Sequence, residues 1–337
     1  IDGKETAAKV AEKIISSLSQ PFQIGMHSLN TSVSLGIAIA PVDGDDFDSL
    51  LQKAVTAMYV SKESARGTYC FFHQSMDDQA KRRLDLSNSL RRSLNTDQFR
   101  LVYQPQVYAD SGRVFGAEAL LRWHPDDRTP ISPTEFIPLA EEIGMILPIG
   151  EWVINQACEQ ARRWRDDGLN CRIAVNVSGI QIYRDDIVAS IQRAAHCAGI
   201  SPELIQVELT ESTLIEDSLL VQDAISGLKA IGASVAIDDF GTGYSSLAYL
   251  KRFRVDKLKI DRSFISDVCI NEESAAMTRA VISIAHSLNM RSIAEGVESP
   301  EQLAFIRQAG CNEVQGYLYS QPLSTSDFLK FAVSRKN

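Results

Sequence analysis

Short apolar runs alternate with amphipathic stretches along most of the chain. Eight runs, rich in apolar and β-branched residues, read FRLVYQPQ, VFGAEALLRW, RIAVNVS, LIQVELTE, SVAIDDF, DKLKID, RSIAEGVE and NEVQGY. In the intervening stretches, such as ILPIGEWVINQACEQARRWRDDG, apolar residues recur at helical spacing. Strands that alternate with helices predict a parallel sheet, and eight of them predict an α/β fold of the (β/α)8 barrel type.

The first two runs are joined by an unusually short connection, VYADSGRV. Parallel neighbours need a crossover of about a dozen residues or more, whereas antiparallel neighbours need only a tight turn. We therefore expect the first strand to lie antiparallel to the second, which departs from the standard barrel.

The N-terminal part of the chain has a different pattern. KETAAKVAEKIISSL predicts a helix, NTSVSLGIAIAP a strand and DFDSLLQKAVTAMYVSKESARG a second helix, so that residues 1–73 form a piece of an α+β domain that begins in mid-fold. The charged, amphipathic segment 74–94 predicts a linker helix. The barrel domain is then expected over residues 95–337.

Composition narrows the functional classes. The 337-residue chain has a net charge of -9 and is 45% hydrophobic, which suits a packed core and argues against non-specific binding of nucleic-acid polymers. No apolar run approaches the about 20 residues that span a bilayer, and no signal peptide is visible. Because the chain starts at Ile1, we expect a fragment without its upstream domains. We expect it to be cytoplasmic, or the cytoplasmic part of a membrane-anchored protein. The six scattered cysteines predict reduced thiols.

Nearly every run carries polar residues near its C-terminal end, where parallel barrels place their active sites. The candidates are Gln104, Glu118, Asn176, Glu208, Glu211, Asp238, Asp239, Lys259, Asp261, Glu295, Glu298 and Gln315. Such a ring of acids and amides around one lysine predicts a catalytic surface.

The run SVAIDDF ends in two adjacent acids, Asp238 and Asp239, whose charges repel and lose hydration if buried. Divalent cations would compensate them. Carboxylate and amide oxygens suit Mg²⁺ or Mn²⁺, and the ring lacks the histidines and cysteines that favour zinc. Neighbouring carboxylates could hold two ions about 4 Å apart, as in phosphodiester hydrolysis. Lys259 could stabilise phosphate charge, or position and deprotonate water.

Other interpretations compete with this one. A single acid at a strand end is commonly a helix cap or a solvated residue, and Lys259 could be a structural ion-pair partner. The loop GTGYSS resembles a dinucleotide-binding turn, but its third glycine is missing and the two acids before it would repel a pyrophosphate.

Several motifs follow one another along residues 82–330. They are YQPQV, EALLRW, SPTEFIPLAEEIG, NVSGIQ, VELTES, AIDDFGTGYSSL, KIDRSF, AEGVE and VQGYLYSQP. Together, and in this order, they resemble the motifs of EAL domains, the bacterial cyclic-di-GMP phosphodiesterases. The resemblance implies hydrolysis of cyclic di-GMP to linear pGpG with Mg²⁺ or Mn²⁺, with two ions expected.

The resemblance also assigns roles to residues. The first ion would be held by Glu118, Asn176, Glu208 and Asp238, and the second would lie near Asp238 and Asp239 with Glu295 close by. Lys259 would contact the attacking water, and Glu211 would hold the loop that begins at Asp239. The substrate pocket would be lined by Gln104, Leu121, Arg122 and Gln315, with Arg122 on a phosphate, and Asp261 and Glu298 are further candidates for substrate binding.

The N-terminal piece resembles the C-terminal part of a GGDEF (diguanylate cyclase) domain, in TSVSLGIAIAP and LLQKAVTAMYVSKESARGTY. The family pattern would place Asp at Val55 and Asn at Gly67, whereas Lys62 and Arg66 match phosphate-contacting positions. The signature itself lies outside the chain, so this piece cannot be a cyclase.

The family resemblance further suggests a homodimer formed next to the DFGTGYSS loop. Within that loop, Gly241 and Gly243 permit backbone shapes that other residues resist, so that the loop could switch. Two alternatives to catalysis stay open. A cyclic-di-GMP receptor would bind the dinucleotide without cleaving it, and a structural module would explain neither the acids nor the lysine.

Overall fold

The structure is a computed structural model in which the chain divides into two compact units, Ile1–Ser89 and Leu90–Asn337. The helix α3 (Gln74–Ser93) contains the division. The structure describes residues 3–25, 27–29, 31–64, 67–94, 96–125, 129–216, 218–241, 250 and 252–335.

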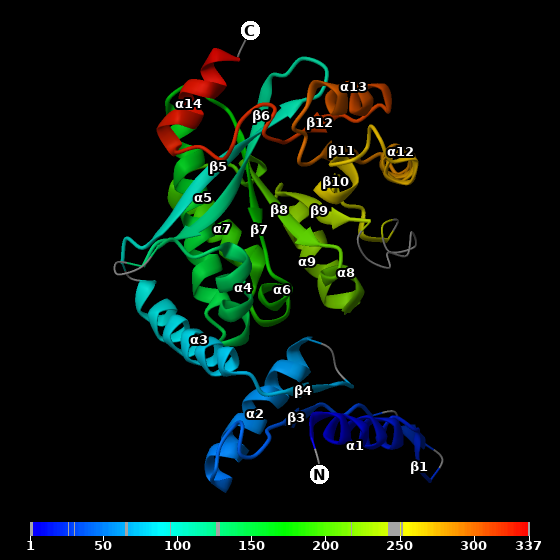
Figure 1. Ribbon diagram of the computed structural model, residues 1–337. Coiled ribbons are helices and arrows are strands. Elements are labelled where there is room, and N and C mark those ends of the chain that lie inside the picture. Colours follow the sequence, from blue (N-terminus) through cyan, green and yellow to red (C-terminus); the bar gives the residue numbers. More distant parts are fainter. Residues whose placement is uncertain are drawn as a thin grey trace. The chain divides into compact units, whose positions relative to one another are not determined.

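The larger unit is built on a closed barrel of eight strands that follow one another in sequence order around the barrel (Figure 1). Each of the eight predicted runs forms one of them. The strands are β5 (Phe99–Tyr108), β6 (Val114–Trp123), β7 (Arg172–Asn176), β8 (Ile205–Thr210), β9 (Ser234–Phe240), β10 (Lys257–Ile260), β11 (Arg291–Ala294) and β12 (Glu313–Val314).

The first barrel strand has the direction that its short connection predicts. Strand β5 pairs antiparallel with β6 and with β12, and the other six neighbouring pairs of the barrel are parallel. Tyr108 donates its backbone N–H to the carbonyl of Arg113 and accepts from Gly112, whose φ of 69° suits a residue without a side chain. The predicted antiparallel first strand is therefore confirmed.

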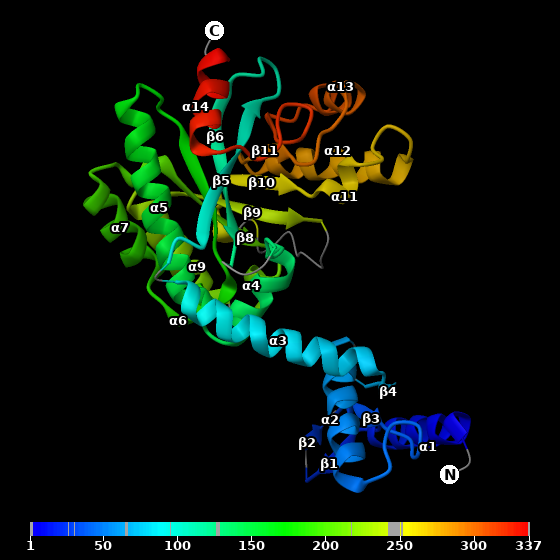
Figure 2. The same ribbon diagram turned by 60° about the vertical axis from the view of Figure 1, so that its left-hand side comes forward.

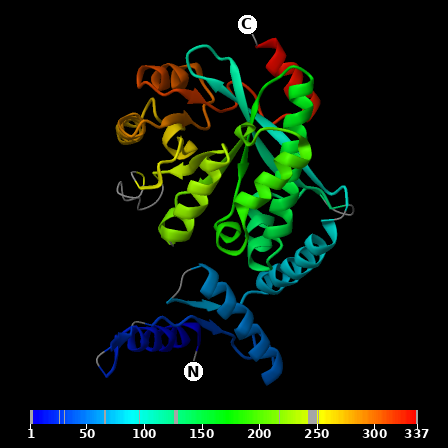
Figure 3. The same ribbon diagram turned by 180° about the vertical axis from the view of Figure 1, so that it is seen from behind.

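Helices lie outside the strands, as the turned views show (Figures 2 and 3). Two of them begin at capping boxes, in which Ser178 and Ser299 exchange hydrogen bonds with Gln181 and Gln302. The helices are α4 (Pro133–Glu142), α5 (Ile146–Asp166), α6 (Gly179–Arg184), α7 (Ile187–Ala198), η1 (Pro202–Leu204), α8 (Thr213–Glu216), α9 (Ser218–Ala230), α11 (Arg262–Ile265), α12 (Glu272–Ser287), α13 (Pro300–Gln308) and α14 (Thr325–Ser334).

The apolar core of this unit lies between the strands and the helices. Trp164 of α5 stacks on Phe328 of α14 with ring centroids 4.4 Å apart, and Tyr103 of β5 meets Trp164 edge to face. Burying a large apolar side chain stabilises a fold by about 1.5–3 kcal/mol. Packing on the outside of the barrel leaves its inside available for polar groups.

The N-terminal unit contains the predicted helix, strand and helix, together with short strands that the sequence did not reveal. Gly36 lets β3 lie directly against α2. Any side chain at this position would collide with the backbone of Ala54 and Met58. The elements are α1 (Gly3–Leu18), the antiparallel pair β1 (Phe22–Ile24) and β2 (His27–Leu29), β3 (Leu35–Ile37), α2 (Phe47–Ser64) and β4 (Tyr69–Phe71), which pairs in parallel with β3.

Of the four positions compared with the GGDEF pattern in the N-terminal unit, the structure describes three. Val55 and Lys62 are exposed on α2, and Gly67 has a positive φ of 82°. Arg66 lies outside the described residues. All six cysteines are free. Among the described helices, none combines the length and apolar character that crossing a membrane requires.

Candidate active site

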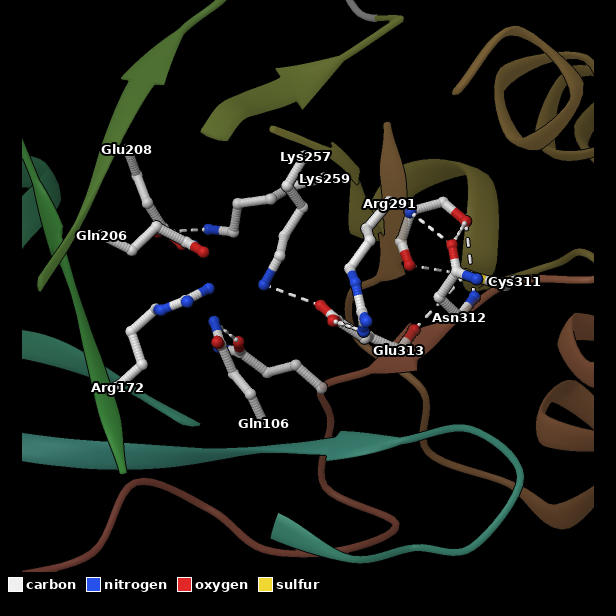
Figure 4. Close-up of polar contacts among 12 residues, drawn as sticks. Gln106, Arg172, Gln206, Glu208, Lys257, Lys259, Arg291, Cys311, Asn312 and Glu313 are labelled. Carbon is white, nitrogen blue, oxygen red and sulfur yellow. Dashed lines mark hydrogen bonds and ion pairs between the residues drawn. The ribbon is translucent and has the colours of Figure 1, made fainter. Parts of the chain in front are cut away.

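Lys259 lies at the centre of a buried cluster of carboxylates inside the barrel. Its Nζ is 2.6 Å from Glu208 Oε2, 2.7 Å from Glu295 Oε1, 3.0 Å from Asp238 Oδ1 and 3.8 Å from Glu118 Oε2. Figure 4 shows the Lys259 amine reaching toward Glu208. Five of the predicted residues, from five different strands or strand ends, therefore meet at one point.

The cluster has more negative than positive charge. Four carboxylates surround a single ammonium group, and the side chain of Lys259 is only 1% exposed. Burial by itself would lower the pKa of Lys259, but the surrounding carboxylates outweigh it and raise this pKa well above its usual value. Lys259 is therefore protonated at neutral pH.

The pKa values of two of the carboxyl groups are raised as well, but here burial is the main cause. Burial raises the pKa of Glu208 to about 8, because the charges of Glu118 and Asp238 add to it and Lys259 opposes them only in part. Burial likewise raises the pKa of Glu295 well above its usual range. The buried acids therefore lack sufficient positive charge from the protein itself.

The oxygens of this cluster are close enough to share one cation. Glu118, Glu208 and Asp238 each offer a carboxylate oxygen, and these three oxygens lie within 4.8 Å of one another. Asn176 donates its side-chain Nδ2–H to Glu118 Oε1 over 2.7 Å, which places its amide beside the same carboxylate. An oxygen-only donor set with excess negative charge fits a hard divalent cation.

The two adjacent acids have different surroundings. Asp238 points into the cluster, whereas Asp239 is exposed and has a φ of 53°, a left-handed conformation that is uncommon for residues other than glycine. Desolvation by the surrounding protein and the charges of Asp238 and Asp261 raise the pKa of Asp239 to about 6. The backbone turn thus aims two neighbouring carboxylates in different directions.

Glu211 holds the segment that follows these acids. Its Oε2 accepts a hydrogen bond of 2.8 Å from the backbone N–H of Gly241, and its own backbone N–H donates to the carbonyl of Asp238 over 3.2 Å. Gly241 has a φ of 101°, which other residues rarely adopt. Gly243 and the rest of the loop, residues 242–249, lie outside the described residues.

Of the predicted substrate residues, one group lies beside the carboxylate cluster and a second group lies at the rim of the barrel. Gln104 and Gln315 are buried beside Glu118, and Arg122, whose Nη1 donates to the carbonyl of Leu121 over 2.9 Å, is partly buried. Burial lowers the pKa of Arg122. These residues lie on β5 and β6 or just beyond β12.

Asp261 and Glu298 lie outside the inner cluster and have other contacts. The carboxylate of Asp261 caps α11 by accepting from the backbone N–H of Ser263 over 2.9 Å. Glu298 forms a half-exposed ion pair of 2.8 Å with Arg262. The structure thus gives both residues local partners at the rim.

Two buried glutamines belong to the site's polar interior although the sequence pattern did not single them out. Gln206 donates its Nε2–H to Glu208 Oε1 over 3.1 Å, and Gln106 donates to Gln315 Oε1 over 3.0 Å. Each lies two residues from a predicted residue on its own strand. Strand alternation, which places residues i and i+2 on one face, is the signal that could have revealed them.

A second ion pair lies deeper in the barrel. Lys257 Nζ is 2.7 Å from Glu313 Oε2, and Arg291 contacts the other oxygen of Glu313 at 3.0 Å (Figure 4). Both Lys257 and Glu313 are almost completely buried. Burial lowers the pKa of Lys257, although Glu313 opposes this effect.

Two known proteins are similar to almost the whole chain. The chain is 42% identical over 324 residues to the bifunctional diguanylate cyclase/cyclic di-GMP phosphodiesterase MucR of Pseudomonas aeruginosa, covering 96% of this chain and 47% of that protein. It is 40% identical over 319 residues to the cyclic di-GMP phosphodiesterase PdeR of Escherichia coli, covering 95% of this chain and 48% of that protein. The chain thus spans about half the length of these relatives.

A solved structure described as the PaMucR phosphodiesterase in complex with c-di-GMP has a TM-score of 0.70 and 41% identity, covering 72% of this chain and 99% of that one. The family model of the diguanylate cyclase GGDEF domain matches residues 2–68. The EAL domain model matches residues 87–322, which is most of the chain and includes the whole carboxylate cluster. The chain therefore belongs to the EAL domain family.

Proposed function

We propose that this chain is a metal-dependent phosphodiesterase that hydrolyses cyclic di-GMP to linear pGpG. The observation that carries the proposal is the complete set of acids around Lys259, with three carboxylates in position to share a cation. Relatives named as cyclic di-GMP phosphodiesterases support the choice of substrate.

The residues present fit a cation. Glu118, Asn176, Glu208 and Asp238 would hold one Mg²⁺ or Mn²⁺, and Asp238 and Asp239 would lie near a second, with Glu295 close by. Such ions act as Lewis acids and make bound water nucleophilic at neutral pH. The excess negative charge of the cluster supports this assignment, because Lys259 is the only ammonium group that the described residues place within it.

Lys259 would position the attacking water and stabilise negative charge on the phosphate. It is protonated, donates a hydrogen bond to Glu208 and forms ion pairs with carboxylates of other strands, so it is a hydrogen-bond donor rather than the base. Its short contacts with Glu208 and Glu295 fix its Nζ in place. A preorganised donor of this kind stabilises charge that develops during the reaction.

Substrate recognition would fall to residues beside the cluster. Gln104, Leu121 and Gln315 would line the dinucleotide pocket, and the Arg122 guanidinium would bind a phosphate, for which its planar donors are well suited. Asp261 and Glu298 would reach the substrate only from the rim. Upstream sensor or GGDEF domains, and a second copy of the chain paired near the loop after Asp239, would be the protein partners.

A direct assay tests the proposal. Purified protein is incubated with cyclic di-GMP and Mg²⁺ or Mn²⁺, and pGpG is quantified by chromatography. Metal-dependent formation of pGpG is expected. Tight binding of cyclic di-GMP without any product would instead identify a receptor, and absence of both would leave the barrel as a structural module.

A further inference from the structure

Gln106 is a buried glutamine inside the barrel, with 2% of its surface exposed. It follows Gln104 by two residues on β5, so both side chains point inward. Its partner across the β5–β6 pair is Gly116, and a Cβ on Gly116 would lie 3.1 Å from Gln106 Oε1. The missing side chain at Gly116 therefore leaves the space in which the Gln106 amide lies.

The contacts of Gln106 fix the orientation of a neighbouring amide. Gln315 donates its Nε2–H to Glu118 Oε2 over 2.6 Å. With its nitrogen toward Glu118, the Gln315 amide turns its oxygen away from that carboxylate. That oxygen accepts from Gln106 Nε2 over 3.0 Å. Gln106 thus supplies the donor that this orientation requires.

The same orientation reaches a second residue of the pocket. Gln315 Nε2 also donates to Gln104 Oε1 over 3.2 Å, which leaves the Gln104 nitrogen to face the carbonyl of Ser320 at 3.4 Å. If the Gln315 amide were reversed, its oxygen would oppose the Glu118 carboxylate and the oxygen of Gln104. A reversal would therefore disturb both residues.

We propose that Gln106 is a positioning residue, which fixes the Gln315 amide so that Glu118 is aligned for a cation and Gln104 for the dinucleotide. The inference rests on the proposed function of Glu118, Gln104 and Gln315. Gln106 itself lies behind these residues and acts only through Gln315. Groups that orient metal ligands typically contribute 10–100-fold to metal affinity or activity.

The test uses Gln106→Met, which removes the donor and keeps an unbranched side chain of similar length. Mn²⁺ affinity is measured by calorimetry, and cyclic-di-GMP affinity is measured separately in EDTA. We expect Mn²⁺ binding to weaken about tenfold and dinucleotide binding to weaken in the same direction. Gln160→Met is the matched control, because Gln160 is also a buried glutamine but lies on the outer helix α5. It should leave both affinities unchanged.

A double-variant cycle separates positioning from general packing. If Gln106 acts through Gln315, the double variant Gln106→Met/Gln315→Met should bind Mn²⁺ no more weakly than Gln315→Met alone. Additive losses would overturn the proposal, as would Mn²⁺ affinity within about twofold of wild type in Gln106→Met. Equal losses in Gln160→Met would also overturn it.

The outcomes distinguish this inference from the proposed function. Wild-type protein that binds Mn²⁺ and dinucleotide but forms no pGpG would contradict the phosphodiesterase assignment, while the binding cycle would still decide the role of Gln106. Active wild-type protein with an unchanged Gln106→Met variant would contradict only the positioning role. Wild-type protein that binds neither probe would overturn both.

Discussion

Replacing Lys259 with methionine removes the ammonium group from the carboxylate cluster and retains the length of the side chain. Contacts of 2.6, 2.7 and 3.0 Å with Glu208, Glu295 and Asp238 are then lost together. Removing one partner of a buried ion pair costs about 3–5 kcal/mol, because the remaining charge is left uncompensated. At about 2–4 °C per kcal/mol, the melting temperature of the metal-free variant should fall by roughly 10 °C.

Turnover of Lys259→Met should fall by more than the loss of stability alone would cause. Loss of one preorganised donor commonly lowers kcat by about 10²–10³-fold, and we expect Lys259→Met to lie in this range while dinucleotide binding largely persists. The assay measures kcat for pGpG formation at a temperature where circular dichroism shows the variant to be folded. Dinucleotide affinity is measured in parallel.

Lys257→Met is the matched control. Lys257 is as deeply buried as Lys259 and is paired with Glu313 at 2.7 Å, but it lies outside the carboxylate cluster. Its replacement should destabilise the barrel to a similar extent and leave kcat near the wild-type value. Turnover of Lys259→Met within about threefold of wild type would refute the reasoning, and so would an equal catalytic loss in Lys257→Met.

Four further predictions follow from the same site. Glu118→Ala should lower Mn²⁺ affinity and reduce pGpG formation by about 10²-fold or more, and full activity would show that Glu118 is not a ligand. EDTA should abolish activity, Mg²⁺ or Mn²⁺ should restore it, and Ca²⁺ should inhibit because its coordination is looser; full activity in excess EDTA would contradict this. Glu211→Ala should release Gly241 and reduce turnover and Mg²⁺ affinity with little change in melting temperature, whereas a loss explained by unfolding would reject a loop-holding role. Because the folded pKa of Glu208 is raised to about 8, the native state binds the extra proton, so metal-free stability should fall as pH rises from about 4.5 to 8; a melting temperature that rises over this range would contradict it.

Much of the barrel could be predicted because its signals are local. Each strand is a short apolar run between amphipathic helices, and the short hairpin after Tyr108 alone determines that β5 is antiparallel to β6. The strands β1, β2 and β4 were not predicted because each has only three residues and, unlike the equally short β3, none lies within a longer β-rich run. Tertiary contacts in the N-terminal unit, such as those made by Gly36, are what place such short strands.

The sequence indicated which residues belong to the candidate site better than it indicated which contacts they make. Residues at the ends of parallel strands must converge, so Glu118, Glu208 and Lys259 could be grouped before any distance was known. The sequence does not give the rotation of an amide or the partner of a rim carboxylate. Asp261 caps a helix and Glu298 pairs with Arg262, and both contacts depend on local loop geometry.

The division of the barrel into two layers explains why catalysis and stability should respond differently to substitution. Large aromatic side chains such as Trp164 and Phe328 pack outside the strands, where apolar burial stabilises the fold. The inside instead holds buried ion pairs, which contribute little net stability when intact but cost several kcal/mol when one partner is removed. The carboxylates around Lys259 are therefore better explained by what they bind or position than by stability. The ion pair between Lys257 and Glu313 lies in the same interior but outside the carboxylate cluster. Replacing either Lys257 or Lys259 should therefore cost a similar amount of stability, whereas only the Lys259 variant should lower turnover.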